Sequence, residues 1–534
     1  QNPSVNGARP TNNSLMINGI DATNMMNGNG SLGNNLTVPL DALEAVEVQT
    51  ALYTAAGGRN GGANIQMITR SGTNEIHGSA SHFFQNELFN ANEFFLNRSG
   101  QARPKFRRNE SYVGIGGPIR KNKTFFYLAA QRTDFTSGFA SRAIAVTGIP
   151  DGLGDVRTRD SIAAVANQWM RSGAQDDPRF AANFLTAVRR FPANQIPGLE
   201  RKFFLDVTNP QAPLLRSLTA ADIHPVAINV LNQRRGGQFL LPSARPDLAV
   251  LPGNGTFGRE RELRQAFPTF FNSWSGSATI EHNFASNDRL RLSYVKSQQF
   301  VQEAFGWANS SPSPTQGQTP GYVASLSHLH TFGPRWINEF RGGFFELFNT
   351  RISLFRDITN SSLGIFNPLE GAIGGLASLM PTIDINTQRS TSGIGNAWDF
   401  FDRQRTIYVA DSVTHIRGNH TLQFGGEIRR PTIAGEYMAR TNGDLDYDNW
   451  VFFFTGHGAA GGGSDLDQGD TRRHFKMIDY AAFLQDDWRV RRGLTLNLGV
   501  RYEFFRYPID TEGRIGSFMT RDMAQRAGVQ PGYY

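Results

Sequence analysis

The sequence predicts an all-β protein: an antiparallel β-barrel of membrane-spanning strands, preceded by a small α+β unit. Three features of the chain support this prediction. Long segments alternate between apolar and polar residues, the links between these segments alternate between short and long, and aromatic residues gather near the segment ends. A soluble sandwich would explain the first feature, but it has no reason to show the second.

The apolar and polar residues alternate with a period of two, which places them on opposite faces of a strand. In the last long segment Leu494, Leu496 and Leu498 share one face, and Thr495 and Asn497 share the other. A tilted membrane strand needs about 9–11 residues, whereas strands of globular proteins average about 5–6. The candidate strands, most of them this long, cover 77–86, 110–118, 123–133, 272–284, 289–300, 321–332, 336–348, 404–416, 420–431, 476–490 and 494–507.

The links between these strands alternate strictly in length. The short turns are Arg120–Asn122, Ser286–Asp288, Gly333–Arg335, Arg417–Asn419 and Arg491–Gly493. The long links are 87–109, 134–271, 301–320, 349–403 and 432–475. In an up-and-down barrel alternate links lie on the same rim, so this order predicts tight turns on one side of a membrane and long loops on the other. That asymmetry is typical of outer-membrane barrels, with short periplasmic turns and long extracellular loops.

Aromatic residues lie in or near the strand ends, where the interface girdles of membrane proteins occur. They are Phe83, Phe84, Phe94, Phe95, Phe125, Phe126, Tyr127, Trp336, Phe344, Phe345, Trp488, Phe504 and Phe505. The alternative is that these side chains fill the core of a soluble sandwich.

The composition argues against several other classes of protein. Of the 534 residues 39% are hydrophobic, with 41 Phe, 13 Tyr and 56 Gly, which suits many strands and turns better than a helical enzyme. The chain has no cysteine, so disulfides and thiolate metal sites are excluded. No apolar run approaches about 18 residues, so no membrane-spanning helix is predicted. The net charge of +7 comes from scattered basic residues, which does not favour a nucleic-acid partner.

The first 75 residues differ from the rest of the chain. They are rich in turns and contain a short acidic helix-like piece at Leu40–Ala45, a strand-like segment at Val46–Gln49 and a strand at Ala63–Arg70. We therefore predict a small α+β domain over residues 1–75 and the barrel region over residues 76–534.

The link 134–271 is too long for a simple hairpin loop. It contains residues with helical spacing at Ser161–Ser172 and at Pro225–Asn232. We interpret it as a partly folded extracellular excursion from the barrel.

The stretches Val5–Asp21 and Leu40–Ser79 resemble the plug domain of TonB-dependent receptors. In the first, an Arg-containing turn precedes a strand and a turn. In the second, a helix leads to a strand with Glu-Val, followed by a Tyr, a Gly-rich turn and a strand that ends in Thr-Arg. The residues that carry the plug motif are Arg9, Asn18, Gly19, Asp21, Glu47, Tyr53, Gly57, Gly61, Gly62, Asn64, Thr69 and Arg70.

Further along, the chain is similar to the Oar-like branch of these receptors, whose members often carry a carboxypeptidase-regulatory-like domain at the N-terminus. The similar stretches are Asn109–Gln131, Asn194–Pro197, Arg417–Arg430 and Tyr480–Phe505. The resemblance implies that the chain is the end of the plug followed by the first half of the barrel, because we count 11 strands of the roughly 22 in the family. An open sheet would leave unpaired backbone groups in hydrocarbon, so we do not expect the isolated chain to insert stably.

The resemblance also implies a function. It implies a receptor in the outer membrane of a Gram-negative-type bacterium that takes up a bulky or scarce solute, with energy supplied through the inner-membrane TonB complex. Its partners would be that complex, reached through a segment that this chain lacks, outer-membrane lipid and lipopolysaccharide, and an unidentified extracellular solute. No nucleic acid, cofactor or catalytic residue is predicted. The alternatives are a surface barrel for adhesion or signalling that moves no solute, and a secreted soluble β protein.

Two groups of site residues follow from this resemblance. The candidate ligand-facing loop of the plug consists of Thr23, Asn24, Asn27, Asn29, Asn34 and Asn35. The candidates for the barrel lumen, expected to be structural, are Glu281, Arg289, Arg291, Arg341, Glu427, Arg429, Arg501 and Glu503. The charged plug residues Arg9, Arg59, Arg70, Glu44 and Glu47 are expected either to pair with the barrel wall or to be solvated.

Other motifs have simpler interpretations. The run Gly57–Gly62 lacks the Gly-Lys-Ser/Thr ending of a phosphate-binding loop, so we expect a tight turn that requires positive φ. The carboxylates of Asp465, Asp467 and Asp470, and those of Asp444, Asp446 and Asp448, could hold Ca²⁺, but the twelve-residue loop with its final Glu is absent and solvated loops are favoured. His328 and His330 lie two apart on one strand face, a spacing that by itself predicts no metal site. Asp486 and Asp487 are adjacent in a strand and point apart, which does not suit acid–base catalysis.

Overall fold

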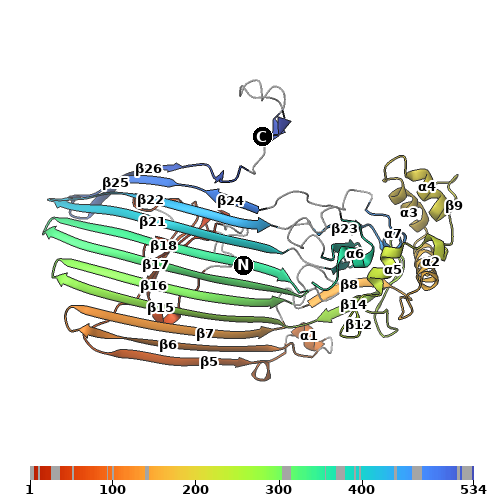
Figure 1. Cartoon of the computed structure of the whole chain (residues 1–534), viewed down its shortest axis with the longest axis horizontal. Coiled ribbons are helices and arrows are strands. Elements are labelled where there is room, and N and C mark those ends of the chain that lie inside the picture. The colour runs from red at the N-terminus through yellow and green to blue at the C-terminus, as the bar shows by residue number, and fades with distance from the viewer. Residues whose placement is uncertain are drawn as a thin grey trace.

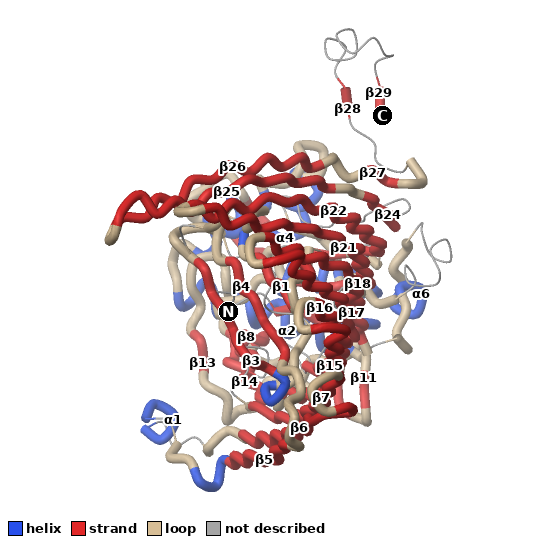
Figure 2. The backbone as a smooth tube through the Cα atoms, turned by 90° about the vertical axis from the view of Figure 1, so that its left-hand side faces the viewer, coloured by secondary structure: helices blue, strands red, loops and turns tan. Residues whose placement is uncertain are grey.

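The computed structural model describes residues 5–9, 12–25, 36–50, 53–59, 61–92, 94–98, 102–138, 144–303, 314–354, 356–367, 379–389, 392–395, 399–437, 442–459, 472–513, 518–519 and 532–533. Its largest feature is a curved antiparallel sheet with short turns at one end of the strands and long links at the other (Figure 1). A smaller sheet lies on the concave side of the large one (Figure 2). Most of the helices lie beyond the long-link ends (Figure 1). None of the described helices is long and apolar enough to cross a bilayer.

Eleven strands form the continuous path of the large sheet, and each pairs antiparallel with the next. They are β5 (His77–Asn86), β6 (Phe106–Arg120), β7 (Thr124–Ser137), β15 (Thr269–Ala285), β16 (Asp288–Glu303), β17 (Thr315–Gly333), β18 (Trp336–Ser353), β21 (Phe400–Arg417), β22 (His420–Tyr437), β25 (Asp479–Arg491) and β26 (Leu494–Phe505). The short strands β24 (Arg472–Lys476) and β27 (Ile509–Asp510) pair beside this path. In the described residues β5 and β26 are the two edges, so the barrel is not closed. The predicted fold class, a partial antiparallel barrel, is confirmed.

Several strands extend further toward the long links than the sequence predicted. Strand β17 begins at Thr315 rather than 321, and β22 ends at Tyr437 rather than 431. Backbone pairing continues at both of these strand ends. Glu303 of β16 pairs with Thr315 of β17, and Phe400 of β21 pairs with Tyr437 of β22. Polar and small residues blur the period of two near these ends, but backbone pairing does not depend on the side chains. The predicted strand 476–490 is also interrupted, because β24 ends at Lys476 and β25 begins at Asp479.

The smaller sheet contains four strands in the order β2-β1-β4-β3. They are β1 (Ser14–Ile17), β2 (Ile20–Asp21), β3 (Leu43–Gln49) and β4 (Asn64–Thr69). The predicted helix-like piece Leu40–Ala45 is wrong: a 3-10 turn covers only Leu40–Ala42, and β3 starts at Leu43 opposite Thr69. Pairing with β4 outweighs the local helix preference, helped by the β-branched side chains of Val46 and Val48. We call residues 5–70 the plug; the domain division at residue 75 stays a prediction.

Three of the long links fold together into one body, which we call the loop domain (144–266, 356–367, 379–389, 392–395 and 442–459). Its helices are α2 (Arg159–Asp176), α3 (Phe180–Val188), α4 (Ile196–Phe203), α5 (Pro225–Leu231), α6 (Asn360–Leu363) and α7 (Trp450–Thr455). Its strands are β8 (Ile144–Pro150), β9 (Phe204–Asp206), β10 (Leu214–Leu215), β11 (Arg234–Arg235), β12 (Gln238–Phe239), β13 (Val250–Leu251), β14 (Glu260–Ala266), β19 (Thr382–Ile385), β20 (Ser392–Gly395) and β23 (Asp444–Tyr447). The remaining small elements are α1 (Phe94–Arg98) and the pair β28 (Phe518–Met519) and β29 (Gly532–Tyr533).

The loop domain has its own hydrophobic core, so it is more than the partly folded excursion that the sequence predicted. Helix α2 contains the predicted Ser161–Ser172 and buries Trp169, and α7 buries all six of its residues. Phe452 of α7 packs against Phe184 of α3, with ring centroids 5.3 Å apart, and against Phe191 at 5.4 Å. Residues from separate links therefore complete one aromatic core.

Glu260 is a buried carboxyl group in this domain. It lies in β14 opposite Pro150 of β8, and its Oε2 accepts a hydrogen bond from the backbone N–H of Gln388 (3.0 Å). Burial raises the pKa of Glu260 to about 7. Because the folded-state pKa lies above the unfolded value, the cost of ionising this buried group grows as the pH rises from about 4.5 to about 7 and then stays constant.

Replacing Trp450 with Ala should destabilise the loop domain by about 3–5 kcal/mol, because this large, fully buried side chain would leave a cavity. The measurement is the rate of native-state proteolysis within 144–264. Phe366→Ala is the control, since the Phe366 side chain is 88% exposed, and its rate should match that of the unaltered protein. Equal proteolysis of the two variants would show that the aromatic core does not hold the domain together.

Replacing Glu260 with Gln should stabilise the loop domain at pH 8 by up to about 3 kcal/mol and have little effect near pH 4.5, because the amide keeps the acceptor but cannot ionise. Thermal unfolding of the domain as a function of pH measures this difference. The same change at Glu262, whose partly exposed carboxylate pairs with Arg389 (2.7 Å), should give no gain at pH 8. A pH-independent effect of Glu260→Gln would contradict the assignment.

Candidate functional site

The contact between the plug and the large sheet contains many hydrogen bonds and several ion pairs. Alternate residues of the barrel strands reach the plug: Arg291, Ser293 and Ser297 of β16 all contact plug residues. The positions between them face away from the plug, as the period of two requires. The face that contacts the plug is the lumen face, and the opposite face is the outer face.

A tight hairpin joins the first two strands of the plug. Asn18 and Gly19 join β1 to β2 and both have positive φ, of 49° and 77°, which is typical of a two-residue hairpin turn. A Cβ on Gly19 would lie 2.9 Å from Cδ of Arg341 in the barrel wall. Strand β1 then pairs in parallel with β4, and this hairpin brings Asp21 to the barrel wall.

Asp21 is the buried anion at the centre of the site. Its Oδ2 lies 2.6 Å from Arg59 of the plug and 3.3 Å from Arg429 of β22, and its Oδ1 accepts a hydrogen bond from the N–H of Thr23 (3.0 Å). Burial opposes ionisation of this carboxyl group, but the guanidinium groups of Arg59 and Arg429 hold its pKa below the ordinary value. Asp21 is therefore an ionised link between plug and barrel.

The barrel side of the site is a chain of ion pairs that spans β22, β25 and β26. Glu427 pairs with both Arg429 and Arg501, and it accepts a hydrogen bond from the hydroxyl of Tyr408 (2.6 Å). Arg501 also pairs with Glu503 (2.8 Å). The three guanidinium groups of Arg59, Arg429 and Arg501 and the surrounding carboxylates thus form one network, to which Asp479 adds a carboxylate 3.7 Å from Arg59. We call it the ionic network.

The Gly-rich loop of the plug lies directly on this network. Arg501 approaches the backbone oxygens of Ala55 (3.4 Å) and Ala56 (3.2 Å), and Gln485 accepts a hydrogen bond from the N–H of Ala55 (2.7 Å). A Cβ on Gly58 would overlap the side chains of Arg501 and Glu503. Close approach therefore explains this glycine.

The predicted reason for the glycine run was wrong in one respect. Gly57, Gly61 and Gly62 do not have positive φ; the left-handed residue of the turn is Arg59, with φ of 66°. That conformation lets the Arg59 side chain reach Asp21. Gly62 is needed for space instead, because a Cβ there would overlap Asn13.

Hydrogen bonds without ion pairs hold another part of the plug, at strands β15 and β16. Thr69 of β4 and Thr279 of β15 have their Oγ1 atoms 3.2 Å apart, and both residues are buried. Asn18 donates to the hydroxyl of Ser293 (2.7 Å), and Arg291 donates to the backbone oxygen of Thr69. Near the other end of the plug, Ser297 accepts a hydrogen bond from the N–H of Thr37 (3.0 Å).

A small apolar cluster separates these polar contacts. It contains Ile17 and Ile20 of the plug and Tyr127, Val323 and Phe345 of the barrel. Tyr127 and Phe345 were among the predicted girdle aromatics, but their lumen-facing positions bury them against the plug. A cavity of about 110 Å³ lies next to the cluster and is lined in part by Asp21, Arg341, Glu427 and Arg429.

The other predicted plug residues have local roles. Tyr53 donates to the backbone oxygen of Gly62, and Asn64 accepts from Ser14 (3.1 Å). Arg70 donates to the backbone oxygen of Leu43 (2.9 Å), Glu47 accepts from Gln49 (2.7 Å), and Arg9 and Glu44 are exposed. The described structure shows an ion pair with the barrel for one of the charged plug residues considered from the sequence. That residue is Arg59, which pairs with Asp479.

In the described structure the remaining lumen candidates form no ion pair with the ionic network, although Arg341 lines the same cavity. Arg341 contacts the Asn18-Gly19 turn and pairs with Glu339 (3.7 Å), whereas Glu281 and Arg289 pair with each other at 3.8 Å. Four further plug partners were not predicted from the sequence: Tyr408, Gln485, Gln404 and Asp479. The period of two places these residues on the lumen face and could have identified them as candidates. The sequence does not show which plug residue lies opposite each of them.

The structure describes part of the candidate ligand-facing loop. Thr23 is bound within the plug through its hydroxyl, and its backbone oxygen accepts from Gln404 (2.9 Å). Asn24 is buried. Asn27, Asn29, Asn34 and Asn35 lie outside the described residues, so the ligand-facing role of this loop stays a prediction.

The acidic clusters considered for Ca²⁺ have separate outcomes. Asp465, Asp467 and Asp470 lie outside the described residues. Asp444 and Asp446 of β23 lie beside Asp384 of β19 in the loop domain, and their side-chain oxygens lie within 4.8 Å of one another. Burial and the two neighbouring carboxylates raise the pKa of Asp384 to about 7.

Comparisons with known proteins agree with this architecture. A family model described as an outer membrane beta barrel domain matches residues 68–533. The TonB-dependent transporter Oar of Myxococcus xanthus is 21% identical over 94% of this chain, and the chain spans 43% of Oar. The outer-membrane transporter YddB of Escherichia coli has the same fold, with a TM-score of 0.50 and 12% identity over 94% of this chain and 50% of YddB. A mutant of the ferric enterobactin receptor PfeA of Pseudomonas aeruginosa matches with a TM-score of 0.46 and 11% identity, over 93% of this chain and 50% of the receptor.

The family match covers most of the chain. The same comparisons confirm two predictions for the chain, its Oar-like character and its outer-membrane location. The chain therefore belongs to the outer membrane beta barrel domain family.

Proposed function

We propose that this chain is the plug end and the first half of the barrel of a transporter, in which the plug shifts to let an extracellular solute pass. The observation that carries this proposal is the plug itself, fastened to the lumen face of the barrel strands through ion pairs and hydrogen bonds. A wide barrel needs such a plug to stay selective. A mostly polar interface also suits reversible movement, because water can take over the hydrogen bonds and solvate the charges when the plug moves.

The energy source belongs to the same proposal. The relative Oar carries the name of a TonB-dependent transporter, and this supports coupling of plug movement to an inner-membrane TonB complex. Strands β1–β4 form one hydrogen-bonded sheet, so a pull on the plug would be transmitted across it to the ionic network. Pulling would have to separate Asp21 from Arg429 and the loop 53–59 from Arg501.

The loop domain would face the outside of the cell, with lipopolysaccharide around the barrel and solute arriving at its surface. The short turns would then face the periplasm. The solute class stays open. A second function, adhesion or signalling without transport, is favoured by one observation: the loop domain is a body with its own dense core, which suits a contact surface as well as a solute gate.

A disulfide between plug and barrel should stop transport if the plug must move. In the full-length receptor, Thr69→Cys with Thr279→Cys would place two sulfur atoms where hydroxyl oxygens now lie 3.2 Å apart, and the chain has no other cysteine. Solute uptake in TonB-containing cells should be lost on oxidation and return on reduction. Each single variant is a control and should transport normally. Normal uptake by the oxidised double variant would exclude movement at this contact, and normal surface binding without uptake in the unaltered receptor would favour adhesion.

Glu427→Gln should loosen the plug. The change leaves Arg429 and Arg501 beside a neutral amide, and breaking a buried ion pair in this way costs roughly 3–5 kcal/mol. Cells that express the full-length variant should become more permeable to a large hydrophilic antibiotic. Glu339→Gln is the matched control, because this lumen carboxylate is 3.7 Å from Arg341 and partly exposed. Equal permeability in the two variants would show that the ionic network does not retain the plug.

A further inference from the structure

A second group of ionisable side chains lies on the outer face of the sheet, at the short-turn rim. Asp288 is the first residue of β16, and His328 and His330 lie near the end of β17. Arg291, Ser293 and Ser297 of β16 face the lumen, so Asp288 falls on the opposite face. The β16–β17 register is uninterrupted and sets His330 directly opposite Asp288, with His328 two residues away on the same face.

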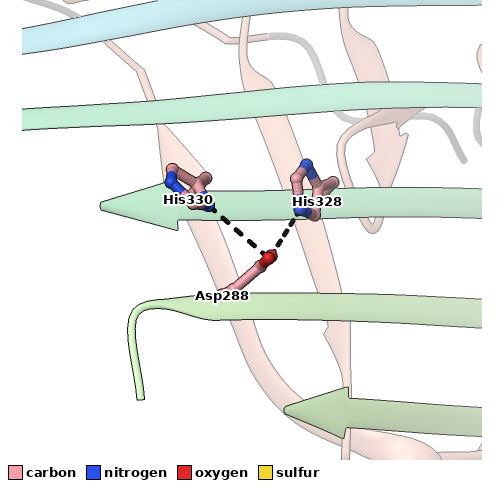
Figure 3. A group of neighbouring side chains, drawn as sticks. All are labelled: Asp288, His328 and His330. Carbon is pink, nitrogen blue, oxygen red and sulfur yellow. Dashed lines mark hydrogen bonds and ion pairs between the residues drawn. The ribbon is translucent and has the colours of Figure 1, made fainter. Parts of the chain in front are cut away.

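The three side chains converge on one point (Figure 3). Nε2 of His328 lies 2.6 Å from Oδ1 of Asp288, and Nδ1 of His330 lies 3.6 Å from Oδ2. One donor atom from each of the three residues can be chosen so that all lie within 4.8 Å of one another. Donor atoms bound to one tetrahedral metal ion at about 2.0–2.1 Å are roughly 3.3 Å apart, so small side-chain rotations would suffice.

We propose that Asp288, His328 and His330 form a binding site for a divalent transition-metal ion such as Zn²⁺. Two imidazoles and one carboxylate are a donor set that favours Zn²⁺, Ni²⁺ or Cu²⁺, whereas Ca²⁺ and Mg²⁺ prefer sites built from oxygen. Three protein ligands leave a coordination position for water. The side chains of Asp288, His328 and His330 are 27%, 36% and 27% exposed. Asp288 directly follows a short turn, so an ion in the water at this rim can reach the site.

The ladder holds the ligands in place before any ion binds. All three Cα positions are fixed by continuous antiparallel pairing, so binding orders only side-chain torsions. The ring of Phe332 packs edge-on against His330, with centroids 4.4 Å apart, and limits its rotation. A bound ion would join β16 to β17, two strands that are connected through the long link 304–314. The site would thus act as a clamp at the rim where no short turn joins these two strands.

The same rim offers a matched control. His420 of β22 pairs with Asp486 of β25 (2.7 Å) and stacks on Trp488, with ring centroids 5.3 Å apart. In β22 the lumen residues are Glu427 and Arg429, so His420 also lies on the outer face. This pair offers one imidazole and one carboxylate. His420→Gln therefore removes a histidine of the same rim and leaves the proposed site intact.

The experiment is a titration of the full-length receptor, purified in detergent, with Co²⁺ as a spectroscopic probe and Zn²⁺ as competitor. One equivalent of Co²⁺ should give the visible absorption of a low-coordinate site, and Zn²⁺ should displace it. His328→Gln, His330→Gln and Asp288→Asn should each weaken binding by roughly tenfold or more, about 1.4 kcal/mol, whereas His420→Gln should bind as the unaltered protein does. Absence of the absorption, or equal loss in the His420→Gln variant, would overturn the proposal.

A second measurement needs no variant. Zn²⁺ should protect His328 and His330 of the unaltered receptor from acylation by diethyl pyrocarbonate, as read by mass spectrometry of peptides. His420 serves as the internal control and should be acylated at the same rate with and without Zn²⁺. Equal acylation of His328 and His330 with and without the ion would exclude the site, whatever the folding of the variants.

Discussion

The structure depends on the need to pair every backbone N–H and C=O group inside a bilayer, where no water is available to bond them. The long strands meet this need with continuous ladders, such as the sixteen residue pairs between β16 and β17. When the backbone forms these ladders, successive side chains must point alternately to the lipid and to the lumen. The tight turns must then reverse the chain in two or three residues, which explains the positive φ of Asn122 and Gly418.

Alternation gives the lumen face a polar character, and this decides how the plug is held. An apolar plug interface would gain free energy from every buried carbon and would be hard to open in water. Here Asp21, Arg429 and Glu427 carry the central contact, and removing one member would leave a buried charge without its partner. The interface is therefore specific in its closed position, and each of its groups can be solvated when the plug moves.

Local pattern explains how much of this could be predicted. Eleven strands and five short turns follow from the period of two and from turn residues such as Gly418, because both signals lie within a few residues of chain. The alternation of side chains along the strands correctly placed Glu427, Arg429 and Arg501 on the lumen face, which contacts the plug. Their plug partners depend on how β1–β4 sit against the barrel, and no local pattern records that placement.

Contacts between distant segments account for what was missed. The core of the loop domain joins α2, β19 and α7, which belong to three separate links, so no single link shows an amphipathic pattern that predicts it. In the same way, His328 and His330 gave no metal signal in the sequence, because the third proposed ligand, Asp288, lies on the neighbouring strand. Tyr127 and Phe345 were predicted to lie in a girdle, because an aromatic residue near a strand end can face either lipid or the plug.

Buried acids in the plug and in the loop domain respond to pH in opposite directions. Asp21 has a lowered pKa, so its contribution to plug binding is present above its unfolded value of about 3.8 and is lost as the pH falls through the folded value. Glu260 and Asp384 of the loop domain have pKa values raised to about 7, so the stability that their protonated forms preserve is lost as the pH rises from about 4 to 7. Because the loop domain shares one core among links that join β7 to β15, β18 to β21 and β22 to β25, weakening that core would free three strand connections together. Raising the pH from about 4 to about 7 should therefore loosen the outer part of the receptor while the plug stays fastened, and only strong acid should reverse that order.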